Sequence, residues 1–136
     1  MSDSRLQFVR DNDTPFARHL GIEIVEASPD RVVAQLSIRP ELCTTPSVMH
    51  GGAMMALADN LGAVGTVLNL PKGATTTTIE SKTNFIAAIK VGETATATCE
   101  PMHRGRTTMI WQTRITREDG RLAAVVTQTQ LVIAAK

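Results

Sequence analysis

The residues best suited to chemistry lie close together in the segment "HGGAMMALADN", which spans residues 50–60. The segment opens with His50, Gly51 and Gly52, continues with apolar residues, and holds one carboxylate, Asp59. Burying a carboxylate among apolar neighbours is costly, because desolvation disfavours its charged form. We therefore interpret Asp59 as a functional group. The alternative is a solvated residue on a narrow strip of the helix surface.

The two glycines stand where the predicted helix begins. The first N–H groups of a helix have no partner within it and lie at the positive end of its dipole. A glycine leaves such an amide uncovered, so Gly51 could polarise a carbonyl group or bind an oxyanion. The alternative is that the glycines permit a sharp turn and that His50 caps the helix or packs against it. The sequence leaves both open.

The spacing of His50 and Asp59 has a consequence for assembly. Their separation corresponds to ~13 Å along a helix axis and about 180° around it, so within one chain they cannot reach one small substrate group. Two such helices, packed antiparallel across a two-fold axis, would bring Asp59 of one chain towards His50 and Gly51 of the other. We therefore predict at least a homodimer if both groups serve one site. Small residues would allow the two helices to approach: Ala53, Ala56, Gly62 and Ala63.

A second polar motif is the basic tip "HRGR" at residues 103–106, which contains Arg104 and Arg106. Arginine at a hairpin tip can bind phosphate, but it is equally typical of a solvated turn. The sequence contains no Walker loop, GxGxxG motif, HExxH motif or cysteine–histidine metal spacing. We expect no metal and no redox cofactor.

Composition argues against several classes of function. With 136 residues, the chain is expected to form a single domain, residues 1–136. A formal net charge of +1 and 3% aromatic residues argue against nucleic-acid binding. Residues 51–70 are mostly apolar, but Asp59 and Asn60 near their middle argue against a membrane span. Two cysteines form no scaffold and the N-terminus shows no signal peptide, so we expect a cytoplasmic protein without membrane contact.

The elements that would position these groups follow from the hydrophobic pattern. Residues 1–21 are expected to form a short helical segment that ends at Gly21. Residues 51–69 are expected to form a central helix whose apolar residues surround its axis, as in a helix buried on most sides. Strands are predicted at 22–27, 31–39, 75–89, 93–103, 107–118 and 121–133. The sum is an α+β fold, in which an antiparallel sheet of about five to six strands wraps round one long helix.

These motifs together resemble the hotdog-fold acyl-CoA thioesterases of the phenylacetic-acid-degradation (PaaI-like) type. The resemblance extends from about Phe16 to Ile133 and includes "FARHLGIEIVEA", "VMHGGAMMALADNLG", "IESKTNFIAAIKVGE" and "HRGRTT". It implies the hotdog fold and hydrolysis of an acyl-CoA, with no cofactor beyond the coenzyme A of the substrate. It also implies a homodimer, or a dimer of dimers, with sites shared between subunits.

The resemblance further implies a role for each motif residue. The Gly51 amide would polarise the thioester carbonyl, and His50 would orient the substrate or the loop. Asp59 would act as general base or nucleophile, and Thr78 would position the attacking water. Further contacts to the acyl-CoA, including its nucleotide end, would come from Thr44, Gly52, Asn60, Arg104 and Arg106.

Two alternatives belong to other classes. Thr44 stands where members of this type often have asparagine, which leaves open a non-catalytic module that binds acyl-CoA, although Asp59 argues against it. A hotdog dehydratase of hydroxyacyl thioesters would also pair histidine with a carboxylate, but its usual motifs are absent. The acyl group, the choice between coenzyme A and a carrier protein, and the role of Asp59 as base or nucleophile are left open. Also open is whether the pocket is lined by Met49, Met54, Met55, Phe85 and Trp111.

Overall fold

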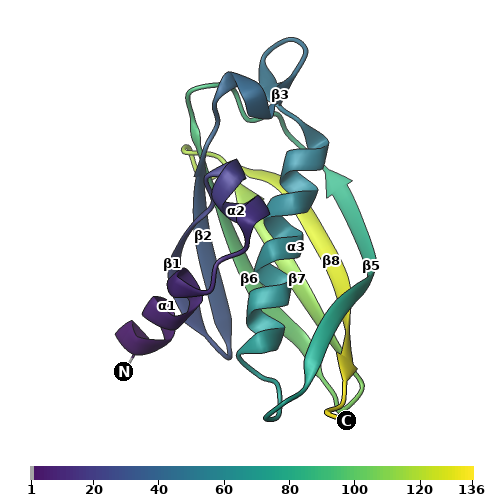
Figure 1. Ribbon diagram of the computed structural model, residues 1–136. Coiled ribbons are helices and arrows are strands. Elements are labelled where there is room, and N and C mark those ends of the chain that lie inside the picture. Colours follow the sequence, from purple (N-terminus) through teal and green to yellow (C-terminus); the bar gives the residue numbers. More distant parts are fainter. Residues whose placement is uncertain (1) are drawn as a thin grey trace.

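The computed structural model describes residues 2–136, in which a long helix lies on one face of a six-stranded sheet (Figure 1). The strand order is β1-β2-β6-β7-β8-β5, and every pair of neighbours is antiparallel. This confirms the predicted α+β hotdog fold. The helices are α1 (Ser2–Asp11), α2 (Pro15–Leu20) and α3 (Gly51–Val67). The strands of the sheet are β1 (Glu23–Ser28), β2 (Arg31–Ser37), β5 (Thr75–Phe85), β6 (Thr94–Arg104), β7 (Thr108–Thr116) and β8 (Leu122–Ile133).

Local chemistry defines both ends of α3. His50 is the N-cap, and its Nδ1 accepts the N–H of Gly52 at 2.8 Å. Past the other end, the Asn69 side chain donates to the carbonyl of Gly65 at 2.8 Å and to that of Pro29 at 2.9 Å. These bonds tie the end of α3 to the β1–β2 turn, and the helix stops two residues before its predicted end at 69.

The core lies between α3 and the inner face of the sheet. Strands β2 and β6 contribute alternating apolar side chains, and Trp111 of β7 is fully buried with them. Two glycines let α3 come close to the sheet. A Cβ at Gly65 would lie 2.8 Å from the Trp111 ring, and one at Gly62 would overlap the Gln128 amide. Glycine lowers helix stability by ~1 kcal/mol relative to alanine, so close packing is the physical reason for glycine here.

Only one side of α3 packs against the sheet. Helices α1 and α2 lie beside it (Figure 1), while Ala56 and Ala63 on its outer side are half-buried and Val67 is 45% exposed. The prediction of a helix buried on most sides is confirmed for the inner side and wrong for the outer side of this chain taken alone. None of the described helices is long and apolar enough to cross a membrane.

Some strands end at residues other than the predicted ones. The strand expected at 75–89 ends at Phe85, because the N–H groups of Ile86 and Ala87 both bond to the carbonyl of Ala123, at 2.8 and 3.0 Å, and interrupt the ladder. A small ribbon, β3 (Cys43–Thr44) and β4 (Val48–Met49), precedes α3 and was not predicted. Its strands have only two residues each, too few for a periodic pattern.

The predicted N-terminal helical segment is confirmed for the described residues, as the two helices α1 and α2, while Met1 lies outside them. Gly21 ends α2 in the left-handed region, with φ of 85°. The Arg10 guanidinium donates to the carbonyl of Ile24 at 2.8 Å, which fastens α1 to β1.

Candidate active site

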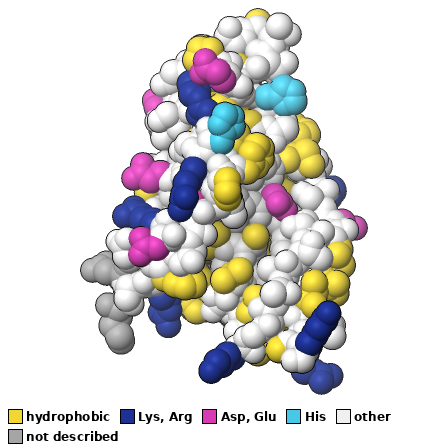
Figure 2. All heavy atoms as spheres, in the orientation of Figure 1, with side chains coloured by type: hydrophobic (Ala, Val, Ile, Leu, Met, Phe, Trp, Pro, Cys, Tyr) yellow, Lys and Arg dark blue, Asp and Glu magenta, His cyan; other side chains and the backbone are white. Residues whose placement is uncertain are grey.

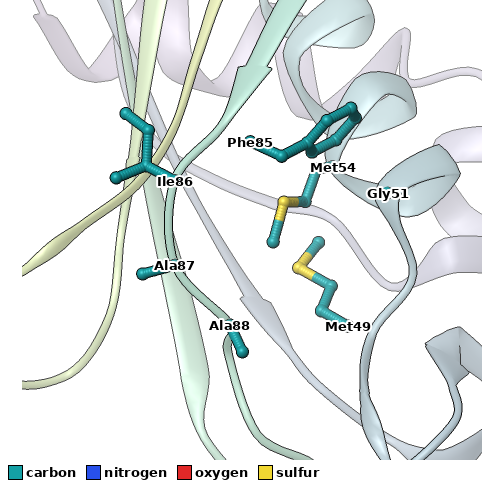
Figure 3. Close-up of a pocket in the computed structure, with 7 residues that line it drawn as sticks. All are labelled: Met49, Gly51, Met54, Phe85, Ile86, Ala87 and Ala88. Carbon is teal, nitrogen blue, oxygen red and sulfur yellow. The ribbon is translucent and has the colours of Figure 1, made fainter.

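A pocket opens at the N-terminal end of α3 (Figure 3). It has a volume of about 380 Å³ and is lined by Met49, Gly51, Met54, Phe85, Ile86, Ala87 and Ala88. Figure 3 shows the two methionine side chains approaching each other between Phe85 and Ala88, while Ile86 and Ala87 point to the other side of their segment. Of the residues whose place the sequence left open, Met49, Met54 and Phe85 line this pocket. Trp111 belongs to the core, where its Nε1 donates to Thr66 at 2.8 Å.

Gly51 presents its backbone at this pocket. Its N–H has no hydrogen-bond partner among residues 2–136, as expected at the first position of a helix. A Cβ at Gly51 would lie 3.0 Å from the Phe85 ring, which is tighter than ordinary contact. Glycine therefore leaves room for the ring and leaves a free amide at the edge of an apolar cavity.

His50 is committed by one ring nitrogen to the start of α3. Because its Nδ1 accepts the Gly52 N–H, Nε2 is the nitrogen left to donate a further hydrogen bond. The side chain is exposed and lines a hollow of about 400 Å³ together with Thr44 and Ser47. The structure thus groups His50 with Thr44, and it assigns the Gly52 amide to capping.

Asp59 lies on the middle of α3 and is half-buried. Its Oδ1 accepts the Thr78 hydroxyl of β5 at 2.7 Å and the Gln128 Nε2 of β8 at 3.3 Å. Its Oδ2 accepts no hydrogen bond from any described residue. Asp59 and Thr78, to which the resemblance gave separate roles as base or nucleophile and as the residue that positions water, are therefore in direct contact, and the second carboxylate oxygen has no partner among the described residues.

The hydrogen bonds continue from Thr78 into the sheet. Gln130 Nε2 donates to Thr78 Oγ1 at 2.6 Å, and Thr76 Oγ1 donates to Gln130 Oε1 at 3.0 Å. Gln128 and Gln130 are fully buried. Neither these two glutamines nor Thr76 was predicted from the sequence as a site residue. The available signal was the alternation in "VVTQTQLVI", which places two amides on the same face as the buried Val126.

The Asn60 side chain does not share the surroundings of Asp59. It lines a cavity of about 120 Å³ between α3 and the N-terminal segment, with Phe8 and Thr14 among the other lining residues. Its Nδ2 is buried and has no hydrogen-bond partner in the described chain. Within one chain, Asn60 does not join the pocket at Gly51.

One chain does not bring Gly51 and Asp59 together. They are eight positions apart on α3, or about 12 Å along its axis. Arg104 and Arg106 are farther still, at the C-terminal end of α3. Arg104 Nη1 donates to Asp30 at 2.7 Å and to the carbonyl of Pro29 at 3.1 Å, the same carbonyl that holds the end of α3. The groups predicted to form one site thus lie apart within a single subunit, at the start of α3, at its middle, in the Asn60 cavity and at the basic hairpin.

The described cysteine, histidine and carboxylate side chains form no cluster that could bind a metal ion. No group of three or more histidine, cysteine, aspartate or glutamate side chains suited to a metal ion occurs among residues 2–136. Burial raises the pKa of the Cys99 thiol to about 12, against which the neighbouring Thr113 side chain acts in the lowering direction. Cys43 is half-buried near the candidate site, and its thiol donates to the carbonyl of Arg39 at 3.5 Å.

Comparison with known proteins places the chain in a family. The model of the thioesterase superfamily matches residues 47–124, which include the start of α3, Asp59 and Thr78. The proofreading thioesterase EntH of Cronobacter turicensis is 30% identical over 103 residues, covering 76% of this chain and 74% of that protein. A hypothetical thioesterase of Streptococcus pneumoniae, solved with coenzyme A, superposes with a TM-score of 0.77 and 25% identity over 85% of this chain and 88% of that one.

The fold comparison extends the resemblance noted in the sequence. The structure of Escherichia coli PaaI, from the phenylacetic acid degradation operon, matches with a TM-score of 0.85 and covers 99% of this chain and 95% of that chain. Its identity is 20%, so this likeness concerns the fold. The chain belongs to the thioesterase superfamily and is a hotdog-fold hydrolase of thioester bonds.

Proposed function

We propose that this enzyme hydrolyses a small or medium acyl-CoA to the free acid and coenzyme A at a site shared by two copies of the chain. The observation that carries the proposal is that the two groups needed for the reaction, an amide and a carboxylate, lie apart on α3. A free amide at Gly51 opens on an apolar pocket, and a carboxylate with one free oxygen lies about 12 Å away on the same helix. A second copy, packed antiparallel, would supply the missing carboxylate to each pocket.

The exposed edge of the sheet supports this assembly. Strand β5 has one neighbour, β8, so its other side presents unpaired backbone groups, and native proteins seldom leave so long an edge open. Figure 2 shows hydrophobic side chains exposed over α3 and β5, and Ile79, Phe85 and Ile86 are each more than half exposed. Pairing two copies along β5 would cover these side chains. A dimer of dimers is an extension of the same proposal.

In the proposed mechanism the acyl group occupies the pocket and its carbonyl oxygen accepts the Gly51 N–H. Asp59 of the partner subunit acts as a general base: its Oδ2 takes a proton from a water molecule while the oxygen of that water attacks the carbonyl carbon. Alternatively, Asp59 acts as a nucleophile: its Oδ2 attacks the carbonyl carbon directly, and water then hydrolyses the resulting anhydride. The new C–O bond replaces the C–S bond, and the thiolate of coenzyme A leaves and takes up a proton. An amide aimed at the developing oxyanion typically supplies 10²–10³-fold in rate.

The coenzyme A arm would run along the partner. In an antiparallel pair with Asp59 beside Gly51, the partner's α3 continues for eight residues, about 12 Å, beyond the reacting carbonyl. Its basic hairpin would then lie on the path of the pantetheine arm. Arg106 forms no ion pair among the described residues and is the side chain we expect to meet phosphate, whereas Arg104 is held by Asp30.

The first test is release of thiol from a panel of acyl-CoAs by the native chain and by Asp59→Asn. We expect turnover with at least one substrate and a loss of more than 100-fold in the variant, with Asp119→Asn on the exposed β7–β8 turn as the matched control. Binding of acyl-CoA without turnover would instead identify a non-catalytic module. Formation of an enoyl thioester without thiol release would identify a dehydratase.

The second test isolates the Gly51 amide. Proline is accepted at the first position of a helix, so Gly51→Pro removes the N–H while retaining the helix start. Gly51→Ala crowds the Phe85 ring in a similar way but retains the N–H. We expect kcat of Gly51→Pro to fall at least 10-fold below that of Gly51→Ala. Equal rates would remove the amide from the mechanism.

Mixed dimers test whether the site is shared. When equal amounts of Asp59→Asn and Gly51→Pro chains exchange at random, half of the dimers combine the two, and each of these has one native site. The mixture should therefore recover about a quarter of the wild-type activity. A site contained in one chain would show no recovery.

A further inference from the structure

Two glutamines lie where apolar residues are expected. Gln128 and Gln130 are fully buried on β8 beneath α3, although glutamine is mostly exposed in folded proteins. Both side chains reach towards the same carboxylate: Gln128 contacts Asp59 directly, and Gln130 contacts it through Thr78. A buried amide requires hydrogen-bond partners, so the direction of each amide matters.

The Gln130 amide can lie in two directions, and they place protons differently. In the observed direction, Thr76 donates to Gln130 Oε1, Gln130 Nε2 donates to Thr78 Oγ1, and Thr78 donates to Asp59 Oδ1. In the reversed direction, Thr76 would donate to the carbonyl of Leu131, which lies 2.8 Å away, and Oε1 would take the single proton of Thr78. Asp59 would then lose its shortest hydrogen bond.

An ionised Asp59 selects the first arrangement. The Thr78 and Asp59 oxygens are 2.7 Å apart, a distance that requires a proton between them. Without that proton, a hydroxyl lone pair would face a carboxylate in a half-buried site, which is unfavourable. The Gln130 N–H₂ group occupies the acceptor side of Thr78 and so commits the Thr78 proton to Asp59.

We propose that Gln130 is a positioning residue of the enzyme: its amide directs the Thr78 proton to Asp59 Oδ1. That bond holds the carboxylate with Oδ2 free for the reaction. Thr76 supports the same direction when its single proton points to the amide oxygen, 3.0 Å away, and not to the carbonyl of Leu131, 2.8 Å away. The inference rests on the proposed role of Asp59, and it assigns a function to a residue that touches neither the substrate nor the carboxylate.

The test uses Gln130→Met, which keeps the volume and removes both amide groups. We expect kcat to fall about 10-fold to 100-fold while KM stays within twofold, because the carboxylate is misplaced while substrate contacts remain. The matched control is Gln112→Met on β7, at a half-buried position on the opposite face of the sheet from Trp111. The control should retain the wild-type kcat.

A double-mutant cycle separates positioning from general stability. In a Thr78→Val background the hydroxyl is gone, so Gln130→Met should cause no further loss in kcat. A second loss of the same size there, or wild-type kcat in the single variant, would refute the role of Gln130. If Gln130→Met melts near the assay temperature, Thr76→Val provides the second route, with a several-fold loss expected alone and none in the Thr78→Val background.

The same assay separates this inference from the proposed function. Wild-type turnover by Asp59→Asn would remove the carboxylate from the mechanism and with it the reason for a positioning residue. Low turnover by Asp59→Asn and Thr78→Val, with unchanged turnover by Gln130→Met, would refute the inference alone.

Discussion

In the two halves of the sheet beneath α3, side chains alternate between the two faces in the same way. The buried side chains of one half are apolar, whereas those of the other half include two amides. On β6, the residues that face the helix are Ala95, Ala97 and Cys99, all fully buried and apolar. On β8, the corresponding positions pass from Val126 to Gln128 and Gln130, equally buried but polar. The polar half is the one next to β5, where Asp59 lies above the sheet.

The β6 side of this comparison supports α3 without any amide. An apolar inner face supports α3 on the β6 side, and the same packing would serve on the β8 side. Burying a polar side chain lowers stability unless it is hydrogen-bonded, so two buried amides on β8 indicate a local requirement. Under the proposed function, that requirement is to hold the Asp59 carboxylate in its direction.

The largest expected effect compares two threonines, Thr78, which is half-buried on β5, and Thr113, which is buried on β7. Thr78→Val, on the polar half, removes the shortest hydrogen bond to Asp59 and should lower kcat about 100-fold. Thr113→Val, on β7 between β6 and β8, makes the same change away from Asp59 and should leave kcat within twofold. Steady-state kinetics on one acyl-CoA compares the two variants. Similar losses in both would show that the halves are not functionally distinct.

The next prediction compares the two helix glycines. In Gly62→Ala the new methyl group must displace the Gln128 amide, and we expect kcat to fall about 10-fold with little loss of stability. In Gly65→Ala the methyl group meets the Trp111 ring, and we expect the free energy of unfolding to fall by about 1–3 kcal/mol with kcat retained. Urea unfolding and kinetics on both proteins test the assignment. A loss of stability with retained kcat in Gly62→Ala, together with a loss of kcat in Gly65→Ala, would overturn this assignment.

A smaller effect is expected for Gln128→Met. The Oε1 of Gln128 is buried without a partner among the described residues, and such a group costs about 1–3 kcal/mol. The variant should therefore melt at the same temperature as the native protein or higher, while kcat falls a few-fold because Asp59 loses its second donor. Thermal unfolding and kinetics provide the measurements. A clear drop in melting temperature would show that the amide serves the fold.

The smallest effect concerns the cysteines. With a pKa raised to about 12, the Cys99 thiolate is present in only about one molecule in 10⁴ at pH 8, so the native protein should not be modified there. Cys43 is half-buried and should react first with a thiol reagent. Because thiolate forms only as the pH rises, labelling of Cys99 should appear only at strongly alkaline pH or on unfolding. Mass mapping of the modified native protein checks this, and labelling of Cys99 at pH 8 would contradict it.

Much of the fold was predictable because it depends on local patterns. The cap at His50, the turn at Gly21 and the alternation along β6 each arise from a few neighbouring residues. The end of α3 and the end of β5 were misplaced because partners distant in the sequence decide them: Pro29 holds Asn69, and Ala123 interrupts the ladder after Phe85. The role proposed for Asp59 remains a prediction on which the kinetic tests bear.

By itself, the sequence determined that a lone carboxylate follows a glycine amide on one helix at a spacing that keeps the two apart. That conclusion needs only helix geometry. The tertiary structure alone decided what surrounds the carboxylate, because its partners Thr78 and Gln128 lie 19 and 69 residues away in the chain. Strand register and the bulge after Thr78 determine which of four consecutive threonines faces Asp59, and no local pattern carries that information.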